Sequence, residues 1–306
     1  MSRDTVTNVA ASTLARLGNL AKATGRRHQD VVQTYALERW LARLAASPHA
    51  DRFVLKGALM LLVWRLPATR PTRDIDLLAR TSNDLEAIAR MVADICKTPV
   101  VEDGMDFESA SVVTSRIAED ALYEGVRATF SASLGSSRLP MQIDLGFSDL
   151  VTPGPERIAF PCLLGHPAPM LNAYNRETAI AEKFHAMVKL GELNSRMKDF
   201  FDIWAMVTTG SFDGANLSAA IQATFRQRQA TMDQHAVCLT EAFGRDQRRH
   251  TQWNAFIRRS AIADAPSEFP AVMQVLRALL LPIAVAIHQQ RPFIDQWPPR
   301  GPWQPA

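Results

Sequence analysis

The segment Arg70-Pro-Thr-Arg-Asp-Ile-Asp-Leu-Leu78 places two aspartates, Asp74 and Asp76, among large aliphatic residues. This alternation is typical of a β-strand, in which residues two apart project from the same face. Both carboxylates therefore leave the strand on one side, while Ile75 leaves it on the other. Two unit charges about 4 Å apart repel by roughly 4 kcal/mol near a protein surface. The pair therefore favours a bound cation, and a divalent ion with oxygen ligands is the usual one.

A third acid stands in a second predicted strand, Met141-Gln-Ile-Asp-Leu145, where Asp144 lies between aliphatic residues. Three carboxylates on adjacent strands form an all-oxygen site suited to Mg²⁺, which keeps several waters and takes substrate phosphates as ligands. Two such ions can hold the attacking and leaving oxygens of a phosphoryl transfer. Taken alone, Asp144 is equally well interpreted as a solvated acid on a strand edge.

Possible phosphate ligands surround the two-acid segment. Lys56-Gly57-Ala58 stands between a predicted strand and a predicted helix, where a glycine lets backbone amides approach a phosphate. Alone, Gly57 is better interpreted as a turn or packing residue. Arg70 and Arg73 flank the acids, and they either bind phosphate or neutralise the carboxylates.

Composition narrows the class of protein. The 306 residues are 47% hydrophobic and 21% charged, with a net charge of +3, which indicates a soluble globular chain rather than a polycation. Three scattered cysteines and seven histidines form no zinc-ligand spacing and indicate a reducing compartment. The longest apolar stretch, residues 272–287, is interrupted by Gln274, Arg277 and Pro282. We therefore predict a cytoplasmic protein without a membrane span.

Periodicity predicts helices at both ends of the chain and a sheet between them. Short alternating segments over residues 99–147, with a hairpin turn at Gly135-Ser-Ser137, predict a mixed sheet that includes strands near 100–101, 111–117, 125–134 and 139–145. A proline-rich passage from residue 152 to 169 predicts a linker with one or two edge strands. Helices are predicted at 5–24, 29–46, 56–64, 84–96, 176–190, 195–209, 215–230, 250–260 and 268–289.

The order of these motifs resembles the AbiEii/AbiGii family of nucleotidyltransferase toxins, within the polymerase-β-type superfamily. The resemblance spans roughly residues 29 to 290. It rests on Gln33-Thr-Tyr-Ala-Leu-Glu-Arg-Trp40, Phe53-Val-Leu-Lys-Gly-Ala58, Arg70-Pro-Thr-Arg-Asp-Ile-Asp76, Gln142-Ile-Asp-Leu-Gly-Phe147, Arg176-Glu-Thr178, Ala181-Glu-Lys183 and Asn194-Ser-Arg-Met-Lys-Asp-Phe-Phe-Asp202.

The resemblance implies an α/β (α+β) fold, with a polymerase-β-like nucleotidyltransferase core containing a mixed sheet and a C-terminal helical domain. The predicted segments are N-terminal helices over residues 1–50, the core over 51–170, the helical domain over 171–290 and an extended tail over 291–306. Ala58 stands where the superfamily usually has serine or glycine. Phosphate binding would therefore rest on backbone amides and nearby cations.

Two further residues enter through the resemblance. Lys183 corresponds to a lysine that contacts nucleotide phosphates, and Asp199 to an acid that holds Lys183 or a substrate hydroxyl. Asp202 shares a helix face with Asp199, three residues apart. For Asp202, a surface pair with Lys198 is an interpretation at least as good as a functional one.

The implied activity is Mg²⁺-dependent transfer of a nucleoside monophosphate from a nucleoside triphosphate to an acceptor, with tRNA the expected acceptor and a cognate antitoxin the expected partner. In this interpretation Asp74 and Asp76 bind the metal, and Asp144 completes the site or activates the acceptor hydroxyl. Two alternatives stay open: transfer to a small molecule or protein, and a non-catalytic nucleotide- or partner-binding module.

A basic stretch near the C-terminus is a candidate RNA surface. Trp253 and Phe256 lie within it and could stack on bases, but at helical spacing aromatic residues are more often core, and a run of charges is usually a solvated face. Arg26, Arg27 and His28 form a smaller candidate. The basic residues of the larger stretch are Arg226, Arg228, Arg245, Arg248, Arg249, His250, Arg258 and Arg259.

Overall fold

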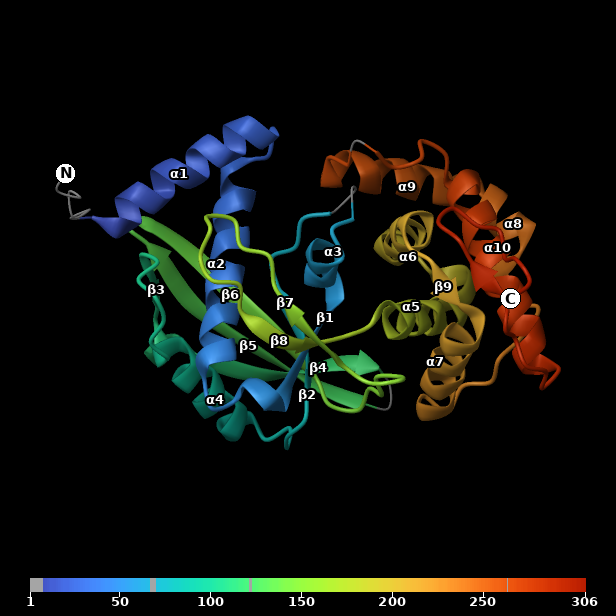
Figure 1. Cartoon of the computed structure of the whole chain (residues 1–306), viewed down its shortest axis with the longest axis horizontal. Coiled ribbons are helices and arrows are strands. Elements are labelled where there is room, and N and C mark those ends of the chain that lie inside the picture. The colour runs from blue at the N-terminus through green and yellow to red at the C-terminus, as the bar shows by residue number, and fades with distance from the viewer. Residues whose placement is uncertain (1–7, 67–69, 121–122, 263) are drawn as a thin grey trace. The chain divides into compact units, whose positions relative to one another are not determined.

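The computed structural model describes residues 8–66, 70–120, 123–262 and 264–306. The chain forms two compact units (Figure 1). Unit 1 consists of Met1–Val63, Pro71–Ser148 and Arg157–Ala173, and unit 2 of Trp64–Arg70, Asp149–Glu156 and Tyr174–Ala306. The segments predicted as N-terminal helices and core thus contribute mainly to unit 1. The predicted helical domain and tail contribute mainly to unit 2.

Unit 1 is built on an eight-stranded sheet. Strand β2 pairs in parallel with β6, and β1 with β8, while β1 and β2, β3 and β5, β4 and β5, and β5 and β6 are antiparallel. The predicted mixed sheet is therefore confirmed. The strand order is β3 (Met105–Phe107), β5 (Tyr123–Leu134), β6 (Ser137–Gly146), β2 (Ile75–Ala79), β1 (Phe53–Lys56), β8 (Met170–Ala173) and β7 (Glu156–Ala159), with β4 (Val113–Asp120) beside β5.

Strands β5 and β6 form the predicted hairpin. Leu134 lies opposite Ser137, and Gly135 adopts φ +58°, which a tight turn of two residues requires. Along β6, Leu139, Met141 and Ile143 are buried and the two residues between them are not, so this strand has one core face and one open face. The strand predicted at 100–101 is wrong: these residues precede β3 in an irregular segment.

Helices α2 (His28–Ala46) and α4 (Leu85–Lys97) cover the core face of this sheet (Figure 1). Trp40 of α2 packs its ring against Phe130 of β5. Helix α1 (Val9–Thr24) contacts α2. Short elements complete the unit: η1 (Ala50–Arg52), η2 (Gly57–Leu59), α3 (Met60–Val63) and η3 (Ser109–Ser111).

Helix α2 is buried along most of its length and carries charged residues inward. The Arg39 and Arg43 guanidinium groups bind the Asp103 carboxylate at 3.0 and 2.7 Å, and all three side chains are at most one-tenth exposed. Tyr35 donates a hydrogen bond to the Asp103 carbonyl. Burial alone would raise the pKa of Asp103, but the two guanidinium groups hold it below its usual value. This network anchors α2 to the segment that leads into β3.

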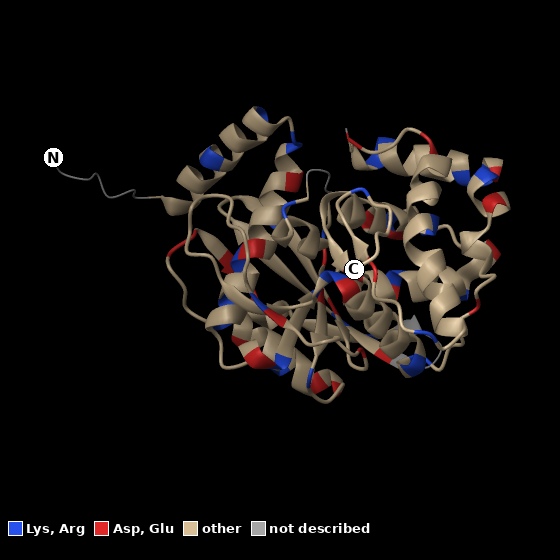
Figure 2. Cartoon of the chain, turned by 45° about the vertical axis from the view of Figure 1, so that its right-hand side comes forward, with Lys and Arg blue, Asp and Glu red and all other residues tan. Residues whose placement is uncertain are grey.

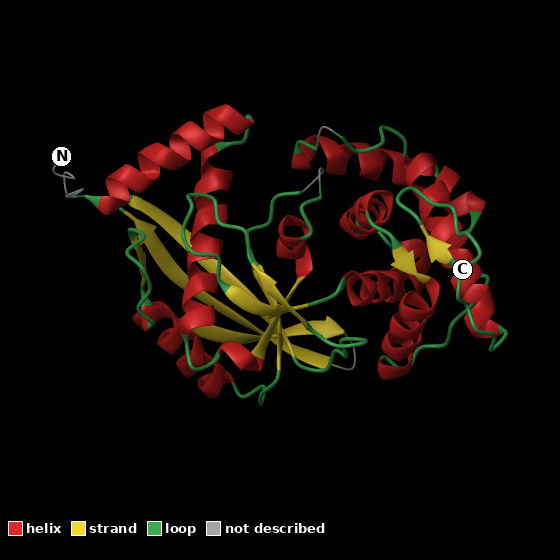
Figure 3. Cartoon of the chain, in the orientation of Figure 1, coloured by secondary structure: helices red, strands yellow, loops and turns green. Residues whose placement is uncertain are grey.

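Unit 2 is helical (Figure 3). Helix α5 packs on α7, and α6 on α10. Phe200, Phe243 and Phe269 stack around one another, with Trp253 beside Phe269. The elements are α5 (Arg176–Leu190), η4 (Gly191–Leu193), α6 (Met197–Thr209), α7 (Gly214–Gln227), η5 (Val237–Leu239), α8 (Glu241–Arg245), α9 (Gln247–Ser260) and α10 (Phe269–His288).

Helix α10 is long and apolar enough to cross a membrane by length and composition. In this fold its apolar residues serve the core of unit 2: Leu276, Leu279, Leu280 and Ile283 are fully buried. Such burial is typical of the central helix of a globular unit.

The C-terminal residues fold onto unit 2. Strand β10 (Gln296–Trp297) pairs with β9 (Phe212–Asp213). The Trp297 side chain is 1% exposed, and its indole donates to the Val207 carbonyl at 2.9 Å. Residues 291–306, predicted as an extended tail, therefore contain a strand and a buried anchor.

Candidate metal and nucleotide site

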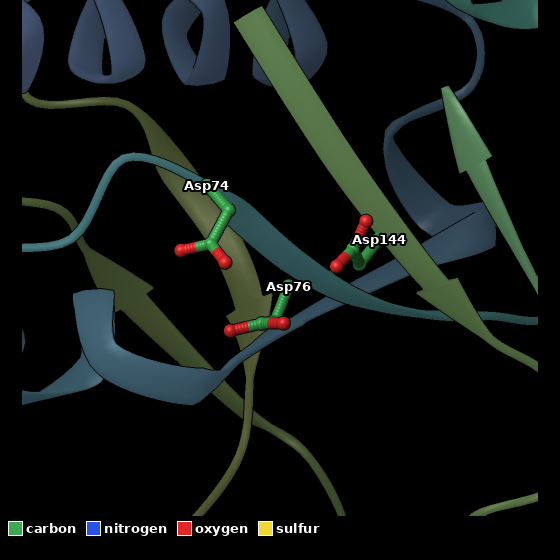
Figure 4. A group of neighbouring side chains, drawn as sticks. All are labelled: Asp74, Asp76 and Asp144. Atoms are coloured by element: carbon green, nitrogen blue, oxygen red, sulfur yellow. The ribbon is translucent and has the colours of Figure 1, made fainter. Parts of the chain in front are cut away.

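Three carboxylates meet on the open face of the unit 1 sheet (Figure 4). Asp74 lies immediately before β2, Asp76 lies within β2, and Asp144 lies opposite Asp76 on β6. One oxygen from each carboxylate lies within 4.8 Å of the others, and all three residues are half-buried. Sequence analysis placed three residues at the metal, and the structure brings all three together.

Gly57 shapes this site from the neighbouring strand. Lys56, the last residue of β1, lies opposite Asp76, and Gly57 follows with φ +73°. A Cβ on Gly57 would lie 1.9 Å from the Asp76 carboxylate oxygen Oδ2. Glycine is therefore required here both by the left-handed backbone and by the close carboxylate. Ala58 is buried in η2, directly after the turn.

The spacing of the three carboxylates fits one divalent ion. Oxygens on a single Mg²⁺ lie about 2.1 Å from the ion, and therefore at most about 4.2 Å from one another. The observed limit of 4.8 Å is larger by less than 1 Å, a difference that side-chain rotation covers. Half-buried carboxylates are also the oxygen donors that Mg²⁺ prefers.

Arg127 joins the site and was missed from the sequence. On β5 it lies opposite Asp144, and its guanidinium donates to both carboxylate oxygens at 2.8 and 2.7 Å. The hydrogen bond to Asp144 raises the pKa of Arg127. The Gln142 amide donates to the same carboxylate at 3.2 Å, and the Thr72 hydroxyl donates to Asp74. The signal was available, because Arg127 stands at an outward position of an alternating strand.

A second charged cluster lies in unit 2. The Lys183 ammonium of α5 donates to Asp202 at 2.8 Å and to Asp199 at 3.2 Å, both on α6. Arg70 binds both oxygens of Asp202 at 2.9 and 3.0 Å, and Arg196 binds Asp199 at 2.8 Å. The predicted association of Lys183 with Asp199 is present. Arg70, expected beside the acids of the two-acid strand, binds Asp202.

The surface pair considered for Asp202 and Lys198 is wrong. Asp202 is fully buried, whereas Lys198 is exposed. Burial alone would raise the pKa of Asp202, but Lys183 and Arg70 outweigh it and lower the pKa to about 2. Burial alone would lower the pKa of Lys183, and the two carboxylates raise it instead. Three cations, Lys183, Arg70 and Arg196, therefore contact these two buried carboxylates.

Residues 39–278 match the model of a family described as nucleotidyl transferase AbiEii toxin, of the type IV toxin–antitoxin system. The chain belongs to this family. It is therefore a nucleotidyltransferase of the AbiEii toxin family, as the motif order predicted, and the family implies a nucleotide substrate and an antitoxin partner. A search of curated proteins found no match.

Two solved structures are similar to this AbiEii-family chain. MenT4, a nucleotidyltransferase toxin from Mycobacterium tuberculosis, is 14% identical with a TM-score of 0.56, and the match covers 90% of this chain and 92% of that one. JHP933 from Helicobacter pylori is 12% identical with a TM-score of 0.48, covering 86% of this chain and 95% of that one. The likeness to MenT4 confirms the predicted fold class.

The C-terminal basic stretch of this AbiEii-family protein is largely paired with acids. Arg249 is buried, binds Glu192 at 2.9 Å and stacks over the Phe243 ring at 3.5 Å. Arg228 pairs with Asp149. Trp253 and Phe256 are buried, which agrees with the core interpretation and removes them as base-stacking groups. Figure 2 shows acidic and basic residues interspersed along the unit 2 helices. RNA binding by this stretch stays a prediction.

Proposed function

We propose that this AbiEii-family protein transfers a nucleoside monophosphate from a nucleoside triphosphate to an RNA acceptor, with tRNA as the expected acceptor, in the cytoplasm. The observation that supports it is the meeting of Asp74, Asp76 and Asp144 within 4.8 Å on the open face of the sheet of a nucleotidyltransferase. We assign Mg²⁺ as the ion held by these carboxylates, because their oxygen donors and spacing suit it.

The proposed reaction is an in-line displacement at the α-phosphorus. The acceptor hydroxyl oxygen forms a bond to phosphorus, the bond between the α-phosphorus and the bridging oxygen breaks, and pyrophosphate leaves. The hydroxyl proton passes to the Asp144 carboxylate, which lies on the strand next to the two-acid strand. When bound, Mg²⁺ supplies charge stabilisation for the entering and leaving oxygens.

The chain's own residues orient the triphosphate. At the turn after β1, Gly57 carries no side chain, so the backbone amides that follow it can approach phosphate oxygens closely. Lys56 precedes the turn and is a proposed counter-ion of the triphosphate. Arg73 precedes the acids and is a proposed contact of an acceptor phosphate instead. Lys183, with Asp199 holding its ammonium, is the proposed phosphate contact of unit 2, as the family resemblance implies.

The decisive experiment replaces one acid. Asp74→Ala is expected to lower nucleotide transfer more than about 100-fold, because even changing a residue that only supports a metal ligand costs 10- to 100-fold. It should leave the protein folded, and it should abolish any growth arrest. Asp106→Ala, which removes an exposed aspartate on β3 of the same unit, is the matched control.

Labelled nucleoside triphosphates with Mg²⁺ and a cell extract, followed by separation of RNA, protein and small-molecule fractions, identify the acceptor. Label in RNA that depends on Asp74 supports the proposal. Label confined to protein or metabolites would redirect the acceptor assignment. Full transfer by a folded Asp74→Ala protein would overturn the metal site.

A further inference from the structure

A hollow lies beside the acids on the same face of the unit 1 sheet. It has a volume of about 430 Å³, within the range of small-ligand sites, about 300–1,000 Å³. The Arg127–Asp144 pair lies on this face, and the next two cross-strand pairs on the same face are Thr129–Gln142 and Ser131–Pro140. The lining residues are Arg73, Ser111, Thr129, Phe130, Ser131, Pro140, Met141 and Gln142.

The hollow is linked directly to the third acid. Gln142 lines it and also donates to both oxygens of Asp144, at 3.3 and 3.2 Å. A group bound in the hollow is therefore one side chain away from the carboxylate that is proposed to accept the hydroxyl proton. This arrangement suits the reactant that carries that hydroxyl.

Strand order separates the two reactants. The order β5, β6, β2, β1 puts the hollow on one side of Asp76 and the Gly57 turn on the other. An in-line displacement requires the attacking oxygen and the leaving pyrophosphate on opposite sides of the phosphorus. If the triphosphate lies at the Gly57 turn, the attacking hydroxyl arrives over β6 and β5, where the hollow is. This step rests on the function proposed above.

The lining favours a ribonucleotide. Its only charged residue is Arg73, whose guanidinium suits a phosphodiester. The hydroxyl groups of Ser131 and Thr129 and the amide of Gln142 suit the two vicinal hydroxyls of a terminal ribose.

We propose that this hollow binds the 3′-terminal nucleotide of the RNA acceptor and presents its hydroxyl to Asp144. Ser131→Trp fills the hollow from an exposed position. Ser133→Trp is the matched control, because it places the same side chain on the same face of β5, one step beyond the lining. The probes are unfractionated tRNA, the same tRNA after periodate oxidation of its terminal ribose, and a fluorescent nucleoside triphosphate analogue with Mg²⁺.

Ser131→Trp is expected to raise the KM for tRNA at least tenfold while binding the nucleotide analogue as the wild type does. Ser133→Trp should change the KM for tRNA less than twofold. Periodate-oxidised tRNA should accept no label. Arg73→Gln should weaken tRNA binding and lower its dependence on salt, by about one unit in the slope of log affinity against log salt, as expected for one lost phosphate contact.

Three outcomes would overturn the inference. In the first, Ser131→Trp leaves the KM for tRNA unchanged. In the second, Ser131→Trp changes the affinity for the nucleotide analogue and not the KM for tRNA. In the third, Ser131→Trp and Ser133→Trp change the KM for tRNA equally. If the wild type labels protein or metabolites and no RNA, the RNA acceptor is wrong although the nucleotidyltransferase site stands. If the wild type transfers nothing and equals Asp74→Ala, the proposed function fails, and this inference fails with it.

Discussion

The charged clusters of the two units follow opposite arrangements. In unit 1, Asp74, Asp76 and Asp144 turn like charges toward one another on a half-buried face. In unit 2, Asp199 and Asp202 are buried, and each contacts two cations. Three gathered carboxylates favour a divalent cation in addition to Arg127, whereas alternating charges satisfy one another. The difference identifies unit 1 as the place prepared for a ligand and the unit 2 cluster as one that also holds its own helices together.

This comparison predicts opposite stability effects for two single substitutions. Lys183→Met should destabilise the protein by about 3–5 kcal/mol, because it leaves two carboxylates buried without their shared partner. Asp74→Asn should stabilise the metal-free protein, by up to about 1 kcal/mol, because it removes one of three mutually repelling charges. Urea unfolding without divalent ions measures both.

Lys198→Met is the control for the first substitution, because Lys198 is exposed on α6. Lys183→Arg keeps the charge and should recover part of the lost stability. Loss of stability in Asp74→Asn as large as that in Lys183→Met would break the contrast between the clusters.

Gly57→Ala tests whether nucleotide transfer depends on the position of the Asp76 carboxylate in unit 1. A Cβ at 1.9 Å from Oδ2 forces the Asp76 carboxylate away from its two partners. Displacement of a reacting group by about 1 Å can cost 100-fold in rate, so transfer should fall about 10- to 100-fold. Gly165→Ala is the matched control: it has a similar φ of +75°, but a Cβ there meets nothing within 4 Å. Equal losses in transfer would show backbone strain, not carboxylate displacement, as the cause.

Arg127→Gln tests whether Arg127 competes with a metal ion for the Asp144 carboxylate. Arg127 occupies both oxygens of Asp144, so a metal must compete with it. Because Arg127 is 39% exposed, removing its charge should strengthen Mg²⁺ binding by only about 1 kcal/mol, roughly fivefold. Calorimetric titration measures it, with Arg116→Gln on β4 as the control. Weaker Mg²⁺ binding would instead assign Arg127 to positioning Asp144.

Sequence reasoning found the acids but not their partners. Alternation fixes the face of a strand residue, which is why Asp74 and Asp76 could be placed on one side. The partner of Arg127 depends on cross-strand register, which the exact turn sets. Arg127 lies seven residues before Leu134, and Asp144 lies seven residues after Ser137. A turn assigned to two residues would therefore have predicted that Arg127 and Asp144 lie opposite each other.

The remaining contacts depend on long-range packing that no local pattern encodes. Arg70 and Asp202 are 132 residues apart in sequence, and Arg43 and Asp103 are 60 apart. Helical spacing predicted the helices that carry Arg43 and Asp202. It offered a surface pair with Lys198 as one interpretation of Asp202 and assigned Arg43 no partner, because burial of an ion pair depends on the element packed against it.

The last predicted effect concerns pH and the unit 2 cluster. The pKa of Asp202 is lowered from 3.8 to about 2 in the folded protein, so its contribution to stability is present above about pH 4 and is lost as pH falls toward 2. From these two values, the contribution shrinks by about 1 kcal/mol between pH 6 and pH 3. Other carboxylates titrate in the same range. The difference in unfolding free energy between wild type and Asp202→Asn isolates this one.

That difference should narrow by about 1 kcal/mol on going from pH 6 to pH 3. Asp246→Asn provides the reference, because Asp246 pairs with exposed Arg248 at a solvent-facing helix start and should show a much smaller change. A constant difference across this range would mean that Lys183 and Arg70 do not hold Asp202 ionised below its ordinary pKa. The carboxylates of the unit 2 cluster would then be no better stabilised by neighbouring cations than the three carboxylates of unit 1.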